Sequence, residues 1–247
     1  MGCGKDEERQ MKILNDIISS ICKDSKVYEV LCGIRWTSVT SRRCGLSSTF
    51  VNSPVHGHVR DVGRLDQKSA LELVGYARSE VQLEASIGMA ALNSLIDIDE
   101  DRLIELNAFD VLAREGEGKA LAVVGHFPFV PYLRNITERL WVIEKDPREG
   151  DLPAEDAKRI LPQADVVAIT GTTFINHTVD ELLDLCRQDS LVMMVGATTP
   201  LSPVLFDYGV DMIAGSMVVD PEKTIKCICQ GATFRQIEGV KHLIMKK

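Results

Sequence analysis

Residues 119–134 have the sequence KALAVVGHFPFVPYLR, which predicts a buried strand, a tight turn and a helix. Residues 120–124 are apolar and rich in valine without polar alternation, a pattern typical of a strand covered on both faces in a parallel sheet. We expect the turn at Gly125 and the start of the helix at Phe127 and Pro128, because proline suits the first helical turn. Such a turn directs backbone N–H groups at the space above the sheet, which makes it a candidate ligand site.

The same alternation of apolar runs and helical patterns continues along the C-terminal half of the chain. Short apolar runs recur at residues 140–143, 165–169, 191–195 and 212–214, with helical patterns between them. Five strands with crossover helices predict an α/β fold with a Rossmann-like, doubly wound parallel sheet. Ligands of such sheets bind beyond the carboxyl ends of the strands, where the strand order reverses.

The N-terminal part has a different pattern, typical of a small α+β unit. Residues 27–41 predict a hairpin, and a glycine turn leads to a third strand near Phe50. Two helices are expected to follow. Asp66 is expected to cap the first helix, and Ser79 with Gln82 forms the pattern of a capping box for the second.

These patterns divide the chain into two domains. We expect a small α+β domain at residues 1–107 and a Rossmann-like α/β domain at residues 108–247. The predicted helix over residues 80–95 carries several small residues, which allow another backbone to approach closely. That backbone can belong to the same chain or to a second copy, so a homodimer stays open.

The composition limits the classes of partner and the location. The 247 residues carry a formal net charge of −8, which argues against nucleic-acid binding and against an anionic membrane surface. No apolar run approaches the roughly 20 residues needed to span a bilayer. The first ten residues lack the apolar core of a signal peptide, and the seven cysteines are scattered. We therefore expect a cytoplasmic protein with free thiols.

Loop residues after the predicted strands define the expected ligand site. His126 can serve as a metal ligand, as a general acid or base, or as a partner of turn carbonyls, and these roles stay open. Glu144 lies about 20 residues after the turn, where dinucleotide enzymes place a ribose-binding acid. The turn is Gly-His-Phe-Pro rather than G-x-G-x-x-G, which argues against NAD bound in the standard way. The expected ligand-binding residues at this rim are Gly125, His126, Phe127, Glu144, Thr170, Gly171, Thr172, Thr173, Asn176, Thr198 and Thr199.

Three other motifs carry weaker signals. His56 and His58 could present two metal ligands on one side of an extended segment, although no third ligand lies nearby in the sequence. His177 lies at the start of a predicted helix, where capping and a functional role both stay open. Cys227 and Cys229 lie two positions apart in a helical pattern, so their side chains are expected to point to different sides.

Several motifs along both parts of the chain resemble those of one family. In the C-terminal part they are GHFPF at residues 125–129, EKDP at 144–147 with Gly150 and Asp151, ADVV at 164–167, TGTT at 170–173, NHT at 176–178 and GATTPLSP at 196–203. In the N-terminal part they are GIRWT at 33–37, GLS at 45–47 and IGMAALN at 87–93. The chain thereby resembles the putative heavy-metal chelation domain family. This resemblance implies an enolase-N-terminal-like domain joined to a Rossmann-like domain, and a role in handling metals or metal chelates.

The resemblance also implies a role for the N-terminal domain. In enolase-like enzymes this domain caps the active site with its hairpin loops. By analogy at the level of the fold, residues from these loops close over the Rossmann rim and contact the ligand. The residues implied in this way are Arg35, Trp36, Thr37, Ser47, Ser48 and Thr49.

Two functions from different classes stay open for this site. The first is binding of a small anionic ligand or a metal chelate in the interdomain cleft, with His126 and Glu144 as ligands of a metal ion. The second is an enzyme that acts on a small molecule or an adenosine-type cofactor, with His126 as the catalytic acid or base. The enzyme hypothesis requires a partner for His126, such as a carboxylate close in space. A scaffold whose cleft is vestigial is a third interpretation.

Overall fold

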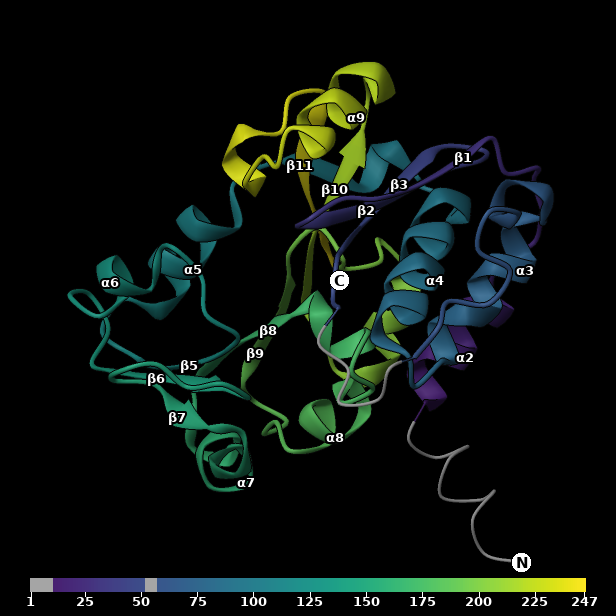
Figure 1. Cartoon of the computed structure of the whole chain (residues 1–247). Helices are drawn as coiled ribbons and strands as arrows, with labels where there is room; N and C mark the ends of the chain where they lie inside the picture. Colours follow the sequence, from purple (N-terminus) through teal and green to yellow (C-terminus); the bar gives the residue numbers. More distant parts are fainter. Residues whose placement is uncertain (1–10, 52–56) are drawn as a thin grey trace, which may run out of the picture.

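The computed structural model describes residues 11–51 and 57–247 and shows a mixed α/β fold with two sheets (Figure 1). The larger sheet has the order β4 (Leu103–Glu105), β11 (Val240–Lys246), β10 (Met212–Val218), β9 (Leu191–Val195), β8 (Val166–Thr170), β5 (Ala120–Val124), β6 (Arg139–Glu144) and β7 (Leu152–Pro153). The smaller, antiparallel sheet contains β1 (Glu29–Cys32), β2 (Trp36–Thr40) and β3 (Cys44–Ser48). The predicted α/β class is confirmed.

In the N-terminal unit, the small sheet packs on helix α4 (Gln82–Leu95), as Figure 1 shows. The predicted hairpin is confirmed as β1 and β2. The third strand is β3, at residues 44–48, so the strand expected near Phe50 was placed too late. Gly45 explains the difference, because a Cβ there would lie 2.1 Å from the carbonyl oxygen of Ala90. The glycine that looked like a turn residue allows the strand to lie directly against α4.

The two helices expected after this sheet have other boundaries and other caps. The first is replaced by η1 (Leu65–Gln67), α3 (Ala70–Val74) and η2 (Gly75–Arg78). Ser69 rather than Asp66 caps α3, through a capping box. The capping box expected from Ser79 and Gln82 was wrong, since α4 begins without a side-chain cap. The Ser79 hydroxyl instead donates a hydrogen bond to the buried carboxylate of Glu84 at 2.6 Å, where an unpartnered oxygen would be costly.

The small residues of α4 allow close packing inside the chain. A Cβ at Gly88 would lie 1.9 Å from the backbone nitrogen of Ala77 in η2, so only glycine permits this approach. The face of α4 that could have served a second copy thus contacts the chain's own η2. The homodimer stays a prediction.

The large sheet contains the five predicted parallel strands and three further ones. β5, β6, β8, β9 and β10 run parallel, and β7 extends this arrangement beside β6. β11 and β4 were not predicted, and they add an antiparallel edge next to β10. β11 mixes three buried apolar residues with exposed lysines, so its short apolar run did not identify a strand. β4 precedes residue 108, and the proposed domain boundary stays a prediction.

The strand order reverses at β5. The chain leaves β5 for β6 and β7 on one side and then returns to β8 on the other side of β5. The loops after β5 and β8 therefore diverge and leave a crevice at the carboxyl ends of these strands. The helix after β5 is α6 (Val130–Leu133), so the start expected at Phe127 and Pro128 was wrong. Gly125 adopts a φ of +106°, and the turn extends to Phe129 before the helix begins.

The remaining helices complete the layers around the two sheets (Figure 1). The remaining helices are α2 (Lys12–Ser19), η3 (Glu100–Arg102), α5 (Ala108–Gly116), η4 (Ala154–Asp156), α7 (Ala157–Ile160), η5 (Leu161–Gln163), η6 (Gly171–Phe174), α8 (Val179–Asp184), η7 (Pro203–Tyr208), α9 (Pro221–Cys229) and η8 (Phe234–Gln236). None of the helices in the described part of the chain is long and apolar enough to cross a membrane.

Candidate functional site

A cavity of about 510 Å³ lies at the carboxyl ends of β5, β6 and β8, where the strand order reverses. Helices α7 and α8 contribute to its walls, and Phe50 reaches it from the N-terminal unit. Eight of the residues expected from the sequence line it: Gly125, His126, Phe127, Glu144, Thr170, Thr172, Thr173 and Asn176. Polar residues that were not predicted also line it, and they are Lys145, Glu155, Lys158, Thr178 and Glu181.

His126 forms a hydrogen-bonded pair with a buried carboxylate. Its Nδ1 lies 3.0 Å from Oδ2 and 3.3 Å from Oδ1 of Asp151, whose side chain is only 1% exposed. The backbone N–H of Arg148 donates a further hydrogen bond to Asp151 Oδ2 at 3.2 Å. A carboxylate at Nδ1 favours the tautomer with the proton on Nδ1, which leaves Nε2 as the basic nitrogen. This nitrogen can accept a proton or coordinate a metal ion.

Asp151 was not among the predicted site residues. It lies 25 positions after His126, beyond β6, and no local spacing in the sequence connects the two. The sequence signal that could have identified Asp151 was its place beside Gly150 after EKDP at residues 144–147, one of the motifs that resemble the family's. Gly150 has a φ of +87°, and the tight turn that it permits immediately precedes Asp151.

Glu144 holds the turn after β5 in place. Its Oε1 accepts a hydrogen bond from the backbone N–H of His126 at 2.6 Å, and its Oε2 accepts one from the N–H of Lys145 at 3.2 Å. The N–H groups of this turn were expected to face a ligand, but that of His126 is already bound to Glu144. The carboxylate thus joins the ends of β5 and β6 and fixes the backbone that carries His126.

In the threonine loop after β8, at residues 170–173, some hydroxyl groups hold the loop together and others can form a hydrogen bond with a ligand. Thr170 caps η6 by accepting a hydrogen bond from the N–H of Thr172, and the two hydroxyl oxygens lie 3.1 Å apart. Thr173 donates its hydroxyl to the carbonyl oxygen of Thr170 at 2.8 Å. Asn176 accepts a hydrogen bond from the Thr178 hydroxyl through Oδ1. Thr170 and Thr172 can still exchange their mutual hydrogen bond for one to a ligand.

Three other residues of the predicted rim lie outside the cavity lining. A Cβ at Gly171 would lie 2.4 Å from the backbone nitrogen of Thr199, so these two residues pack against each other. The Thr198 side chain is buried, and its Oγ1 accepts a hydrogen bond from the N–H of Ser48 at 2.9 Å. Thr198 thereby joins β3 to the loop after β9.

The residues implied for the cap also lie away from the cavity lining. The Trp36 indole donates a hydrogen bond to the carbonyl oxygen of Ala232 at 3.1 Å, and Thr37 exchanges one with Thr49 at 2.9 Å. The Trp36 contact attaches the small sheet to the C-terminal segment, and the Thr37 contact lies within the N-terminal unit. The others of this set, Arg35, Ser47 and Ser48, are likewise not lining residues of the cavity.

The weaker histidine motifs have separate positions. His177 does not cap α8, because its Nε2 lies 2.8 Å from the carbonyl oxygen of Ala77 in the N-terminal unit. His58 lines a different cavity, and His56 lies outside the described residues. Within residues 11–51 and 57–247, no group of three His, Cys, Asp or Glu residues is arranged to hold a metal ion.

Comparison with known families assigns both parts of the chain. A model of the family DUF364, described as putative heavy-metal chelation, matches residues 107–246. The chain belongs to this putative heavy-metal chelation family. A second family model with the same description, DUF4213, matches residues 14–96. The resemblance inferred from the sequence motifs is thereby confirmed.

A curated relative and two solved structures match most of this chain. An uncharacterized protein of Methanocaldococcus jannaschii is 29% identical over 234 residues, covering 89% of this chain and 88% of that protein. A crystal structure of a DUF364 protein with unknown function from Desulfitobacterium hafniense has a TM-score of 0.85 and 29% identity, covering 96% of this chain and 99% of that one. A further DUF364 structure, from Pyrococcus horikoshii, has a TM-score of 0.81 at 20% identity, covering 97% and 100%, and supports the fold alone.

Proposed function

We propose that the cavity at the reversal of strand order binds a small metal chelate, and that His126 is the protein's ligand to the metal. The observation that carries this proposal is the hydrogen bond between His126 Nδ1 and the buried Asp151 carboxylate. Metal-ligating histidines commonly donate their other N–H to a carboxylate, which orients the ring and makes the coordinating nitrogen more basic. The description of the family, putative heavy-metal chelation, supports the same chemistry.

The proposal assigns most of the metal's donors to the bound molecule. His126 has no pair of further His, Cys, Asp or Glu ligands among the described residues. Glu144 was expected to be a second metal ligand, but both of its oxygens accept backbone hydrogen bonds. If a chelator fills the metal's other coordination positions, the protein needs to supply only one ligand, the Nε2 of His126. We therefore propose a chelate as the ligand, in preference to a bare ion.

Other lining residues suit the organic part of such a ligand. Chelators of metal ions usually carry carboxylates, and Lys145 and Lys158 offer cationic groups at the cavity. Lys158 lies 3.3 Å from Glu181 in an exposed ion pair, which a ligand carboxylate can replace at small cost. The hydroxyl groups of Thr170 and Thr172 complete the set as hydrogen-bond donors. The proposed ligand is thus anionic as well as metal-bearing.

Titration calorimetry with Ni²⁺–iminodiacetate tests this proposal, because that complex leaves coordination positions open for an imidazole. We expect the His126→Ala variant to bind the complex at least about tenfold more weakly than the wild type, and Asp151→Asn to lose about 10–100-fold through the misoriented ring. His242→Ala is the matched control, because this histidine is exposed on β11 and does not line the cavity. Equal affinities for wild type and His126→Ala would contradict the proposal.

The same dyad favours an enzyme as the second candidate function. A histidine oriented by a buried carboxylate can act as a general base, and the enzyme hypothesis required such a partner for His126. Mass spectrometry of a metabolite extract incubated with the protein tests this candidate. Loss of one metabolite and gain of another with the wild type, but not with His126→Ala, would favour catalysis. An unchanged extract that nevertheless yields a protein-bound chelate would favour binding.

We further propose that the protein works in the cytoplasm. The thiols of Cys22, Cys32, Cys44, Cys186 and Cys227 are unpaired, as suits a reducing compartment. Fractionation of the native host, followed by immunoblotting, tests this location, and recovery from a membrane or extracellular fraction would contradict it.

A further inference from the structure

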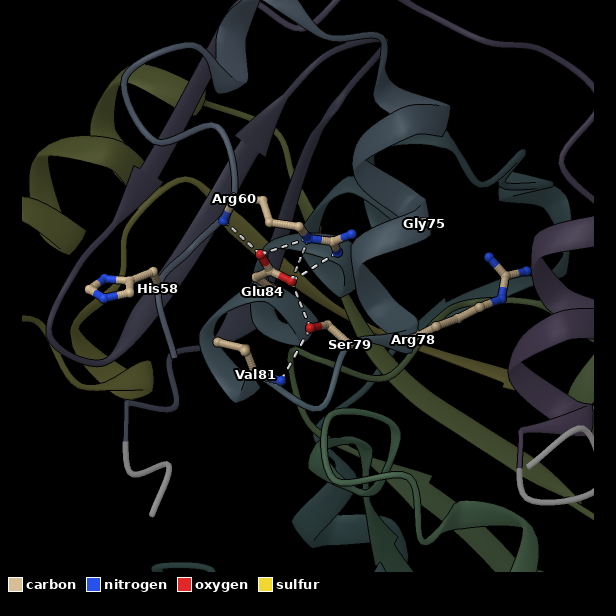
Figure 2. A pocket seen from close by; sticks show the side chains of 7 residues that line it. All are labelled: His58, Arg60, Gly75, Arg78, Ser79, Val81 and Glu84. Atoms are coloured by element: carbon tan, nitrogen blue, oxygen red, sulfur yellow. Dashed lines mark hydrogen bonds and ion pairs between the residues drawn. The ribbon is translucent and has the colours of Figure 1, made fainter. Parts of the chain in front are cut away.

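A second cavity, of about 410 Å³, lies in the N-terminal unit (Figure 2). Its lining residues do not overlap with those of the cavity at the sheet edge. Residues from three segments meet there: the loop after residue 57, the helix η2 and the start of α4. They are His58, Arg60, Gly75, Arg78, Ser79, Val81 and Glu84.

Arg60 is held in one position at this cavity. The buried carboxylate of Glu84 accepts hydrogen bonds from the Arg60 backbone N–H at 2.7 Å, from its Nε at 3.0 Å and from its Nη2 at 2.9 Å. The guanidinium also lies 4.5 Å from the centre of the Tyr76 ring. The Arg60 side chain is nevertheless 60% exposed. Because a guanidinium has five N–H donors, the group can bind Glu84 and still offer donors on its outer side.

The loop that carries Arg60 is fixed by further contacts. Asp61 accepts a hydrogen bond from the Tyr76 hydroxyl at 3.1 Å and forms an ion pair with Lys68 at 2.8 Å. Asp61 has a φ of +55°, a conformation that non-glycine residues retain only when their surroundings hold them. The guanidinium of Arg60 is therefore ordered before any ligand arrives, which lowers the entropy lost on binding.

A second arginine lies across the cavity. Figure 2 shows Arg60 and Arg78 on either side of Gly75. Arg78 donates through Nε to the Asn15 side chain at 2.7 Å, and its two Nη groups have no hydrogen-bond partner among residues 11–51 and 57–247. A Cβ at Gly75 would meet no atom within 4 Å, so the space between the arginines is open. Glu84 balances one of the two positive charges, and the other is unbalanced by the lining residues.

We infer that this cavity is a second ligand site, which binds a phosphoryl group between Arg60 and Arg78. Guanidinium groups present paired N–H donors that match the oxygens of a phosphate, and the interaction is charge-assisted. The Nη groups of both arginines would donate to the phosphoryl oxygens, with His58 at the edge of the cavity. The inference does not depend on the metal-chelate proposal, because it concerns other residues.

Titration calorimetry with inorganic phosphate tests the inference on the full chain. We expect saturable binding by the wild type, weakened at least about tenfold in Arg78→Gln, which removes one guanidinium without exposing Glu84. Gly75→Leu is expected to abolish binding by filling the open space, and circular dichroism checks that both variants are folded. Arg235→Gln, at an exposed arginine outside the cavity, is the matched control.

Three results would overturn the inference. The first is that the wild type does not bind phosphate, and the second is that Arg78→Gln binds it as tightly as the wild type. The third is that acetate displaces phosphate at equal concentration, because the site would then be a general anion site. The His126→Ala variant separates the two cavities. Unchanged phosphate affinity supports the second site, and a loss would place the ion at the sheet edge instead.

Discussion

Gly171 offers a sharp test of how the loops around the main cavity are packed. The sequence placed it among the ligand-binding residues, whereas the structure packs it on Thr199. A Cβ at residue 171 would lie 2.4 Å from the Thr199 nitrogen, 2.5 Å from its Oγ1 and 2.8 Å from its Cα. Two of these atoms belong to the backbone, so a side-chain rotation cannot relieve the contact. The loops after β8 and β9 would have to separate.

The size of the effect follows from two opposing terms. Overpacking of this kind costs about 1–3 kcal/mol. Replacing glycine with alanine also restricts the unfolded chain, which offsets about 0.4–1 kcal/mol. We therefore expect Gly171→Ala to lower the free energy of unfolding by about 1–2 kcal/mol, or the melting temperature by about 2–8 °C for a chain of this size.

Urea unfolding followed by circular dichroism measures this loss, and Gly75→Ala provides the matched control. Gly75 lies in a helical conformation and a Cβ there meets no atom within 4 Å, so alanine should leave stability unchanged or raise it slightly. If Gly171→Ala were as stable as the wild type, or if both variants lost the same free energy, the packing argument would be refuted.

Three further predictions concern single side chains. Burial raises the pKa of Glu84, but its hydrogen bonds, chiefly with Arg60, outweigh burial and leave the pKa below its ordinary value. The Glu84 carboxylate therefore stabilises the fold at pH values above its unfolded pKa, and this stability is lost as the pH falls through the lower folded pKa. We expect the free energy of unfolding of Glu84→Gln, measured in urea, to depend less on pH between about 5 and 3 than that of the wild type. Burial raises the pKa of Cys186 to about 12, so iodoacetamide at pH 8 should label it more slowly than Cys22, and equal rates in peptide mass spectrometry would contradict this. Asn93 donates to the backbone carbonyl oxygens of Leu46 and Thr198, so Asn93→Ala should lower the free energy of urea unfolding by about 1–3 kcal/mol, and an unchanged midpoint would refute that role.

The sequence predicted those parts of the fold that depend on local pattern. The apolar runs of the parallel strands are continuous because both faces of the sheet are covered, and all five were located. β11 lies between β10 and the short edge strand β4, and only three of its residues are buried, so its apolar run is short. Gly45 was misread because a glycine at a close backbone contact looks the same in sequence as a glycine in a turn.

At the candidate site, too, the features that depend on local sequence were predicted, and those that depend on distant contacts were not. The rule for parallel sheets placed the loops after β5 and β8 together, and the cavity lies there. Asp151 was not predicted, because its hydrogen bond with His126 depends on how the loop after β6 folds back. The spacing of residues in the sequence does not reveal that conformation. Thr198 and Thr199 follow a neighbouring strand, yet the buried contacts with Ser48 and Gly171 take them out of the cavity lining.

Native mass spectrometry of protein purified without a metal-affinity column tests the central claim most directly. The account predicts a bound mass with the isotope pattern of a metal together with an organic chelator, retained by the wild type and by His242→Ala but lost from His126→Ala. An adduct that His126→Ala retains in full would contradict the assignment of the metal to His126 and its Asp151-oriented ring.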